Sequence, residues 1–325
     1  MSSFSRRRFI ATGSSCCAYI LGLTQNSPAE AKKLFQQDGG RLRLVEEQWG
    51  RIELLGDKLW GVVSTPEKGS YQTFCNGGVV GGDEKTLVVE SFARAEGASW
   101  LSGWVKTKTG KWPTDVVISH YHPDHSGGIA GFINKQDEPP TLWMTGPNRT
   151  KIERIFKQRN PPEKDAILEL LKNAEIVSDG QTRTLDLGGR KVSFVTRSGH
   201  TGSDITVEVA DPKTVFCGDL VWNGMFPNYG DSKPIELDKD VQNIMSTGNA
   251  IYIPGHGPIA DIDEVKVYHE VLQSVEKAAR LAIDKGIPLD QAVKNFKLRE
   301  PLDKWGLFSP GYYSEAFKAW NRTLQ

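Results

Sequence analysis

The chain has 325 residues, 38% of them hydrophobic, and its 40 lysines and arginines are balanced by 40 aspartates and glutamates. A net charge of zero leaves no basic surplus to neutralise a phosphate backbone, so the composition argues against a nucleic-acid-binding protein. Four cysteines in a chain of this length exclude a disulfide-based scaffold, and a chain this long can bury a substantial core without one.

The N-terminal segment has the organisation of an export signal. Arg6 and Arg7 belong to a basic start that precedes an uncharged stretch, Phe9 to Gln25, and a small-x-small cleavage motif follows at residues 29–31. The paired arginines and the glycine and serine residues of the uncharged stretch resemble a twin-arginine signal. We therefore expect residues 1–31 to be a signal peptide and the mature protein, residues 32–325, to be periplasmic.

A membrane anchor and a lipid attachment are the alternatives for this segment. The uncharged stretch is shorter than the roughly 20 apolar residues that span a bilayer, and it is interrupted at residues 13–15. Gly13 also stands where a lipoprotein signal has a larger aliphatic residue. We therefore expect no stable membrane anchor after cleavage.

Short segments rich in β-branched residues predict a first series of strands, and apolar residues at helical spacing predict the helices between them. The expected helices cover residues 94–106 and 165–172, and the charged stretch 146–173 is a candidate helical flap. The expected strands are 51–55, 59–63, 86–89, 116–118 and 142–144.

A second series of strands is expected at residues 192–195, 205–209, 214–217 and 251–253. Two strand series, each with its own helices, predict an α/β fold in which two sheets pack together with helices outside. A long helix from about residue 265 ends near Gly286, and a shorter one begins at Pro288. No linker divides residues 32–325, so we expect one domain with a helical C-terminal extension over about 264–325.

The two cysteines of the mature chain, Cys75 and Cys217, lie in apolar surroundings. Such surroundings favour buried, unpaired thiols over a disulfide.

Five of the six histidines fall in three short segments, each at the end of a predicted strand. The first segment is the HYHPDH sequence of residues 120–125. Residues i and i+2 of an extended segment point the same way, so His120 and His122 can bind one ion from the same side. The proline that follows turns the chain, which can direct Asp124 and His125 toward a second position.

His200, Asp219 and His256 follow three later strands, and each stands beside glycine. Five imidazoles and two carboxylates are enough to bind two borderline metals such as zinc with coordination sites left open. A lone histidine is usually a core or surface residue, and His269 on the long helix fits that interpretation. Chance does not readily explain HxHxDH, GH, GD and GHG segments in this order.

In this order and spacing, the HxHxDH segment with the GH, GD and GHG segments closely resembles the metallo-β-lactamase superfamily over residues 51–260. The resemblance implies an αββα sandwich of two mixed sheets, with the metals at one edge between the sheets. It implies that Asp219 bridges two metals. The other implied ligands are His120, His122 and His200 for the first metal, and Asp124, His125 and His256 for the second.

Two zinc ions, with iron or manganese as alternatives, would share a water and lower its pKa toward 7, so that a bridging hydroxide attacks a carbonyl. Asp219 is expected to hold the bridge, and Asp124 is a candidate to orient the hydroxide or carry its proton. The expected reaction is hydrolysis of an ester, thioester, lactone or lactam in a small-molecule substrate.

With a bridging Asp219, the ligand set is similar to that of hydroxyacylglutathione hydrolases and of many lactone or ester hydrolases. β-Lactamases with the HxHxDH form generally lack it. The basic glutathione-holding pattern of the first group is not identified in residues 264–325.

Two other functions fit the same motifs. Persulfide dioxygenases of the superfamily keep similar ligands but use a single iron and oxygen, and an accessory factor in periplasmic enzyme maturation would bind a protein partner. A phosphodiesterase acting on nucleic acid is disfavoured by the export signal and the neutral charge.

Aromatic residues near the motifs are candidate substrate contacts. Trp222, Phe226 and Tyr229 follow Asp219 and either contact the substrate or pack their loop onto the core. Trp100 and Trp104 are expected to face the core from their helix.

Overall fold

The computed structural model describes residues 41–133 and 139–324. The segment expected to be a signal peptide, residues 1–31, lies outside the described residues. From Leu44 onward the described residues belong to one compact unit. Among them, none of the helices combines the length and the apolar character that crossing a bilayer requires.

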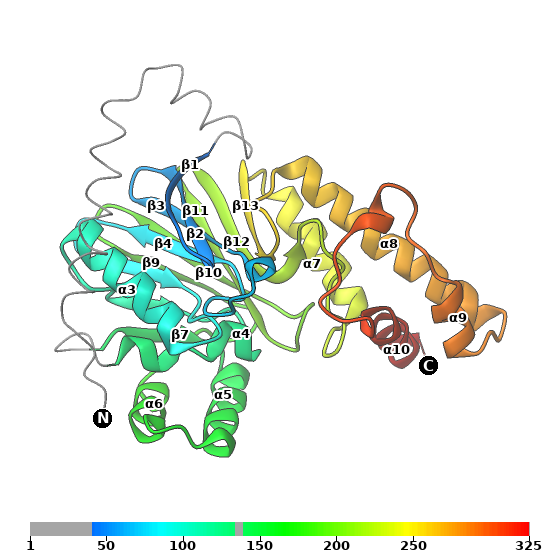
Figure 1. Cartoon of the computed structure of the whole chain (residues 1–325), viewed down its shortest axis with the longest axis horizontal. Coiled ribbons are helices and arrows are strands. Elements are labelled where there is room, and N and C mark those ends of the chain that lie inside the picture. Colours follow the sequence, from blue (N-terminus) through cyan, green and yellow to red (C-terminus); the bar gives the residue numbers. More distant parts are fainter. Residues whose placement is uncertain (1–40, 134–138, 325) are drawn as a thin grey trace. The chain divides into compact units, whose positions relative to one another are not determined.

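The first sheet has eight strands within the described residues, in the order β1 to β8 (Figure 1). Strands β2 to β5 pair antiparallel, whereas β5 to β8 pair parallel and are connected by helices. The strands are β1 (Leu42–Glu46), β2 (Gly50–Gly56), β3 (Leu59–Ser64), β4 (Gly77–Gly81), β5 (Thr86–Val89), β6 (Asp115–Val117), β7 (Thr141–Met144) and β8 (Glu175–Ile176). The helices among them are η1 (Pro66–Lys68), α3 (Ala95–Thr109), α4 (Pro123–Ser126), η2 (Ile129–Phe132), α5 (Gly146–Arg159) and α6 (Lys164–Lys172).

The second sheet has five strands within the described residues, in the order β13-β12-β11-β10-β9. Strands β9 to β12 form an antiparallel meander, and β13 returns parallel to β12 after helix α7 (Pro234–Ser246). The strands are β9 (Thr182–Asp186), β10 (Lys191–Arg197), β11 (Asp204–Ala210), β12 (Lys213–Trp222) and β13 (Ile251–His256).

Buried apolar residues divide into three layers, which explains why most strands are apolar on both faces. Leu87 of the first sheet and Phe216 of the second belong to the core between the sheets. Val88, one residue after Leu87, faces the opposite way and packs with Leu101 of α3. Val215 of β12 packs outward with residues of α7 and α8 (Ile262–Asp284). The layers are helix, sheet, sheet and helix, which confirms the αββα sandwich.

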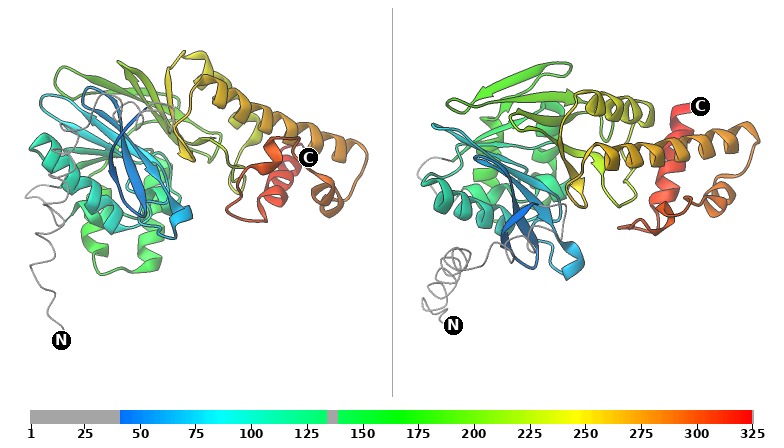
Figure 2. Two further views of the ribbon diagram at one scale, coloured as in Figure 1. Left: turned by 45° about the horizontal axis from the view of Figure 1, so that its top comes forward. Right: turned by 90° about the horizontal axis from the view of Figure 1, so that it is seen from above.

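The C-terminal part of the chain is helical, and α8 is its longest element. Asp261 caps the first turn of α8 in a capping box with Glu264, which fixes where the helix begins. Helix α10 (Tyr312–Leu324) packs on α7, α8 and α9 (Leu289–Asn295), with η3 (Leu302–Lys304) between α9 and α10. Figure 2 shows α8 starting beside β13 and running away from the sheets, with α9 and α10 packed along it.

The sequence did not predict β1, β4, β8 or β9, and one predicted strand ends too early. The sequence did not indicate β4, because its GGVVG composition is unfavourable for a strand. At Gly78 a side chain is excluded, since a Cβ atom would lie 2.4 Å from the ring of Phe216 in the facing sheet. The strand expected to end at Cys217 continues to Trp222, so Asp219 lies within β12 and not after it.

Both cysteines of the described residues, Cys75 and Cys217, are buried and unpaired, as predicted. The expected helices at residues 94–106 and 165–172 correspond to α3 and α6, and α5 makes residues 146–159 of the charged stretch 146–173 helical.

Candidate metal centre

The HYHPDH segment leaves β6 and turns directly into the short helix α4. His122 occupies the N-cap position and the following proline starts the helix, where its missing N–H is not needed. The Nε2 atom of His120 and the Nδ1 atom of His122 lie 3.0 Å apart. These two side chains therefore converge on one position, as their i, i+2 spacing predicts.

His200 reaches the same position from the turn between β10 and β11. The buried Asp204 carboxylate accepts hydrogen bonds from the backbone N–H groups of His200 and Thr201 at 3.1 and 2.9 Å. This turn directs Nε2 of His200 to within 3.0 Å of Nδ1 of His122. His120, His122 and His200 are called the first ligand group below.

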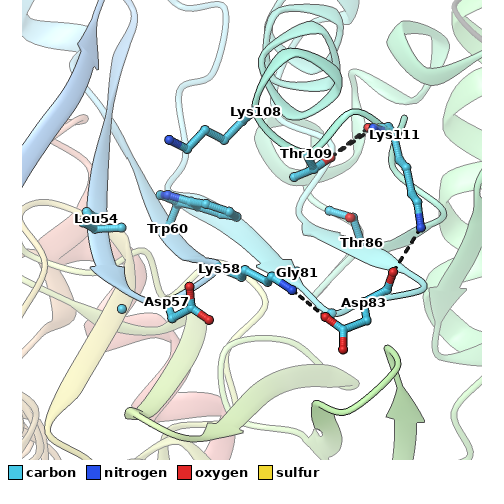
Figure 3. A pocket seen from close by; sticks show the side chains of 12 residues that line it. Leu54, Asp57, Lys58, Trp60, Gly81, Asp83, Thr86, Lys108, Thr109 and Lys111 are labelled. Carbon is cyan, nitrogen blue, oxygen red and sulfur yellow. Dashed lines mark hydrogen bonds and ion pairs between the residues drawn. The ribbon is translucent and has the colours of Figure 1, made fainter. Parts of the chain in front are cut away.

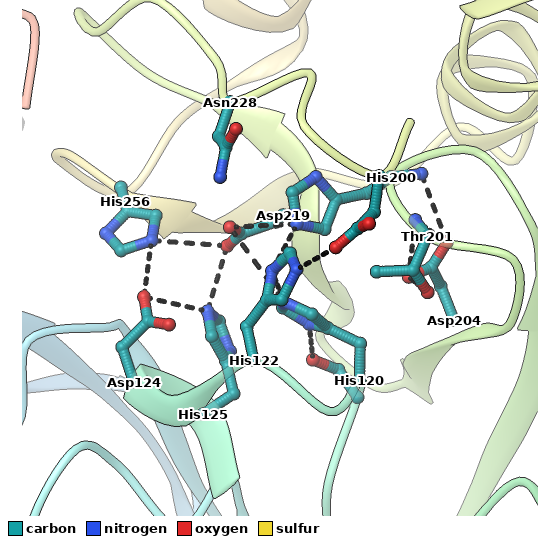
Figure 4. Close-up of polar contacts among 12 residues, drawn as sticks. His120, His122, Asp124, His125, His200, Thr201, Asp204, Asp219, Asn228 and His256 are labelled. Atoms are coloured by element: carbon teal, nitrogen blue, oxygen red, sulfur yellow. Dashed lines mark hydrogen bonds and ion pairs between the residues drawn. The ribbon is translucent and has the colours of Figure 1, made fainter. Parts of the chain in front are cut away.

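Asp219 lies between two groups of side chains, with one carboxylate oxygen toward each (Figure 4). Its Oδ2 atom lies 3.4 Å from Nε2 of His200, in the first ligand group. Its Oδ1 atom lies 3.0 Å from Nε2 of His125 and 3.4 Å from Nε2 of His256. Gly255 makes this placement possible, because a Cβ atom there would lie 1.9 Å from Oδ1.

Asp124, His125 and His256 form the second ligand group. The Oδ2 atom of Asp124 lies 3.2 Å from Nε2 of His256 and 3.6 Å from Nε2 of His125. The loop that carries His256 is fastened by buried Asn76, whose Nδ2 donates to the carbonyls of Pro254 and Gly257 at 2.9 and 2.7 Å. The loop between β3 and β4 thus positions a ligand at the end of β13.

The seven side chains fit a pair of divalent metal ions. In each ligand group, taken with Asp219, the nearest nitrogen and oxygen atoms all lie within 4.8 Å of one another. Within the described residues, Nε2 of His125 and Oδ1 of Asp219 are buried and have no aligned hydrogen-bond partner. Buried polar atoms are rarely left without one. Imidazole nitrogens with carboxylate oxygens are the donors that zinc and similar metals prefer.

Side chains outside the seven hold the ring nitrogens that face away from the convergence points. Nε2 of His122 lies 3.0 Å from Oδ2 of Asp231, and Nδ1 of His125 lies 3.1 Å from Oε1 of the buried Glu90. Such contacts fix the orientation of a histidine ligand and raise its basicity. The sequence did not indicate Asp231 or Glu90, because single acidic residues outside a motif carry no spacing signal.

The two ligand groups differ in protonation. Burial and the neighbouring imidazoles lower the pKa of His120, and burial lowers the pKa of His200 to about 3, so both are neutral near pH 7. Burial also opposes a charge on His256, but the carboxylates of Asp219 and Asp124 outweigh it and raise the pKa of His256 to about 9. In the metal-free protein the second group therefore holds protons that a metal ion must displace.

The other residues singled out in the sequence lie outside the two groups. His269 pairs with Asp238 at 2.7 Å, as expected for a structural histidine. Phe226 and Tyr229 are buried in the core beside α7 and α8, so they pack their loop. Trp222 is buried too, but its ring lies 4.1 Å from the ring of His256.

The tryptophans of α3, Trp100 and Trp104, pack against the core next to the first sheet, as expected. On the far side of the HYHPDH segment, α5 places Nζ of Lys151 3.8 Å from the ring centre of Tyr121. The charged helix therefore lies beside the first ligand group.

A cavity of about 540 Å³ lies elsewhere, around Trp60 (Figure 3). Its lining includes Thr86, the first residue of β5, whereas Glu90, just after the end of β5, contacts the second ligand group. The cavity thus lies at the opposite edge of the sheet. Asp83 pairs with Lys58 at 2.6 Å within it, and none of the seven side chains lines it.

Comparison with protein families gives a match to the metallo-β-lactamase superfamily over residues 71–256. This span exceeds half of the chain and contains both ligand groups. The αββα sandwich and its seven convergent side chains define a metal-dependent hydrolase fold. The chain belongs to the metallo-β-lactamase superfamily, and its homologues in that superfamily are metal-dependent hydrolases.

Three relatives illustrate the range of the family. An atrochrysone carboxyl ACP thioesterase from Aspergillus fumigatus is 26% identical over 48% of this chain and 42% of its own length. A hydroxyacylglutathione hydrolase from Idiomarina loihiensis is 25% identical over 43% of this chain and 44% of its own length. A metallo-β-lactamase type 2 from Bacillus sp. (strain 170) is 24% identical over 75% and 91%. The match spans less than half the length of the first two relatives.

Solved structures show the same fold. A metallo-β-lactamase from Pontibacter korlensis aligns with a TM-score of 0.55 and 18% identity, covering 69% of this chain and 99% of its own. The sec-alkylsulfatase Pisa1 from Pseudomonas sp. aligns with a TM-score of 0.64 and 16% identity, covering 84% of this chain and 50% of its own. At these identities the likeness concerns the fold alone.

Proposed function

We propose that this protein is an exported dinuclear zinc hydrolase that cleaves an ester, thioester or lactone bond in a small-molecule substrate, with a lactam as the alternative. The observation that carries the proposal is Asp219, which directs one carboxylate oxygen to each ligand group. A single metal would need only one of those oxygens. The shared carboxylate therefore supports two metals.

Metal ions bound to the two groups would polarise a carbonyl and lower the pKa of water, which makes a Ser or Cys nucleophile unnecessary. The protein supplies a rigid setting for this chemistry. His120, His125, His200, Asp219 and His256 are almost completely buried, while Asp124 keeps 21% of its side chain exposed. Asp124 is thus the carboxylate of the cluster that solvent and substrate reach most easily, and we assign it the transfer of the proton.

The type of bond is supported by the chemistry of the relatives. Two of them are named for thioester substrates, an acyl carrier protein thioester and a glutathione thioester, and the third is named a β-lactamase. The attack on a carbonyl is common to all three. The bridging Asp219 favours the ester, thioester and lactone members of this series for the present chain.

The cellular location rests on the N-terminal sequence. Residues 1–31 with Arg6 and Arg7 resemble a twin-arginine signal, and this pathway suits a protein that acquires metal while folding. The mature domain, residues 32–325, would then act in the periplasm. A fusion reporter tests this: export should be lost when Arg6→Lys and Arg7→Lys are combined, and unchanged export would contradict the proposal.

Metal analysis of the purified mature protein, followed by a panel of esters, thioesters, lactones and lactams, tests the enzymatic proposal. About two zinc ions per chain are expected, with turnover of at least one carbonyl substrate. Asp219→Ala should lower both the metal content and the turnover, whereas Asp238→Ala, at the structural pair with His269, should keep them.

Two outcomes would contradict the proposal. One iron per chain with consumption of oxygen would indicate a dioxygenase. Full metal content without turnover, together with a stable complex with another periplasmic enzyme, would indicate an accessory factor.

A further inference from the structure

The side of the centre next to His256 is surrounded by aromatic rings from three distant parts of the chain. Trp222 of β12 lies 4.1 Å from the His256 ring, Phe308 lies 5.1 Å away, and Phe74 lies 6.2 Å away, measured between ring centres. Phe74 and Phe308 contact each other at 5.1 Å. Tyr312, at the start of α10, lies 6.3 Å from Trp222.

Exposure distinguishes these rings from the core. Trp222 is 1% exposed and forms the back of the group, as a core residue would. Phe308 and Tyr312 contact Trp222 and Phe74 contacts Phe308, yet all three rings remain half-buried. Partly open rings beside a reactive centre provide an apolar surface for a substrate.

The backbone at Phe74 is a second, independent observation. Its φ angle is 64°, in the left-handed region that side chains other than glycine rarely adopt. The neighbouring Asn76 fastens this loop to the loop of His256, so the conformation is held by the site itself. Strained residues of this kind concentrate where a side chain must face a ligand.

The opposite side of the centre is charged. There His122 contacts Asp231, the Tyr121 hydroxyl donates to Asp231, and the Lys151 ammonium lies over the Tyr121 ring. A substrate that lies across the two ligand groups thus meets a polar surface at one end and an apolar one at the other. Two of the four rings at the apolar end, Phe308 and Tyr312, belong to the C-terminal extension, which the family match to residues 71–256 does not include.

We propose that Phe74, Phe308 and Tyr312 form an aromatic subsite that binds a flat, apolar group of the substrate beside His256, so that the preferred substrates carry an aromatic ring near the scissile carbonyl. The proposal rests on the proposed hydrolase function and names its substrate class. The C-terminal extension is then a specificity element that completes the site. Burial and the charges of Asp219 and Asp124 raise the pKa of Tyr312 to about 12, which agrees with its position near the ligand groups.

Matched thioester pairs test the subsite on the metal-loaded enzyme. The first pair is the 3-phenylpropanoyl and butanoyl thioesters of one thiol, and the second is the thioacetates of 3-phenylpropane-1-thiol and butane-1-thiol. The ring is too far from the reacting atoms to change their reactivity. We expect the KM of the phenyl member to be about tenfold lower in at least one pair. Oxygen esters replace the thioesters if the substrate panel identifies that bond.

Variants of neighbouring residues separate a binding role from a structural one. Phe308→Ala should abolish the preference for the phenyl member, and Phe308→Leu, which keeps the apolar volume, should reduce it. Leu307→Ala, at the exposed neighbour, should retain it. Tyr312→Ala should also reduce the preference for the phenyl member. Tyr313→Ala should retain it, because Tyr313 faces away toward Phe226.

Binding without turnover keeps the two proposals distinguishable. Calorimetry should show tighter binding of 3-phenylpropanoate than of butanoate to the metal-loaded protein, and the difference should disappear in Phe308→Ala. Turnover of neither member of a pair would count against the hydrolase, while this binding difference would still support the subsite. Equal KM values within both pairs, equal binding of the two acids, or a preference that survives Phe308→Ala would overturn the subsite.

Discussion

The histidines of the first ligand group are held in a defined orientation before any metal arrives. His122 shows this most clearly, because its Nδ1 atom faces His120 and His200 while its Nε2 atom lies 3.0 Å from Asp231. The carboxylate of Asp231 fixes which nitrogen is free to bind. Asp231 is half-exposed, so it does this without a deeply buried charge.

Asp231→Asn should therefore weaken metal binding by about 10- to 100-fold, since it removes the charge that orients and polarises His122. Competition with a chromophoric chelator measures the affinity. Asp238→Asn is the matched control, because Asp238 pairs with His269 in the same way outside the centre. The interpretation fails if the two variants bind metal equally well.

The pH dependence of metal binding follows from His256. Its pKa of about 9 in the metal-free protein means that a metal ion must displace a proton near neutral pH. Apparent metal affinity should rise with pH between 7 and 9, because His256 and His125, whose pKa is also raised, both hold protons that the metal displaces. Calorimetry in buffers of different ionisation enthalpy should detect the released proton, and an affinity independent of pH between 7 and 9 would contradict this.

The same pKa predicts an opposite trend for stability. Because the folded-state pKa of His256 lies above its usual value, the stabilisation is complete below about pH 6.5 and is lost as the pH rises through about 9. The metal-free protein should therefore melt at a lower temperature at pH 9 than at pH 6.5. Thermal unfolding of the metal-free and metal-loaded forms at both pH values separates the two trends.

At the scale of elements, the loop between β3 and β4 connects the two sheets at the centre. Asn76 accepts a hydrogen bond from the N–H of Ser64 and donates to the carbonyls of Pro254 and Gly257. Asn76→Ala should lower the free energy of unfolding by about 1–3 kcal/mol, since it leaves buried polar groups unpaired. It should also weaken metal binding by loosening His256.

Denaturant unfolding of the metal-free variant measures the first effect, and a metal titration measures the second. Asn243→Ala on the exposed face of α7 is the control and should change neither. Loss of stability with unchanged metal affinity would show that Asn76 supports the fold without positioning His256.

The sequence predicted most strands because apolar, β-branched segments are buried on both faces in a sandwich. It missed β4, where glycine is required by the close approach of Phe216, and it ended β12 too early at Cys217. It also missed β1, β8, β9 and α7, and it predicted the helical C-terminal extension without locating α10 in it. The seven converging side chains were predictable because their spacing is a motif, whereas Glu90, Asp231 and Asn76 act through contacts that only the fold creates.

At the scale of the whole molecule, the centre joins parts of the chain that are far apart. The ligand groups come from residues 120–125 after the first sheet's β6 and from three elements of the second sheet, up to His256. Metal should stabilise the folded protein by about 2.7 kcal/mol when its free concentration is 100 times its Kd. Removal by a chelator should lower the Tm by several degrees, and Asp219→Ala should abolish this dependence on metal.

Because of the same distribution of ligands, bound metal ions would link two distant parts of the chain as a chemical cross-link does. Every first-sheet ligand lies before residue 126, and every ligand of the second sheet lies after residue 199, with the exposed turn between α5 and α6 in the interval. A protease cut at residues 160–163 would separate the chain into two polypeptides that share the metal pair. In the loaded protein those fragments should migrate together on gel filtration under mild denaturant, and a chelator should release them from each other.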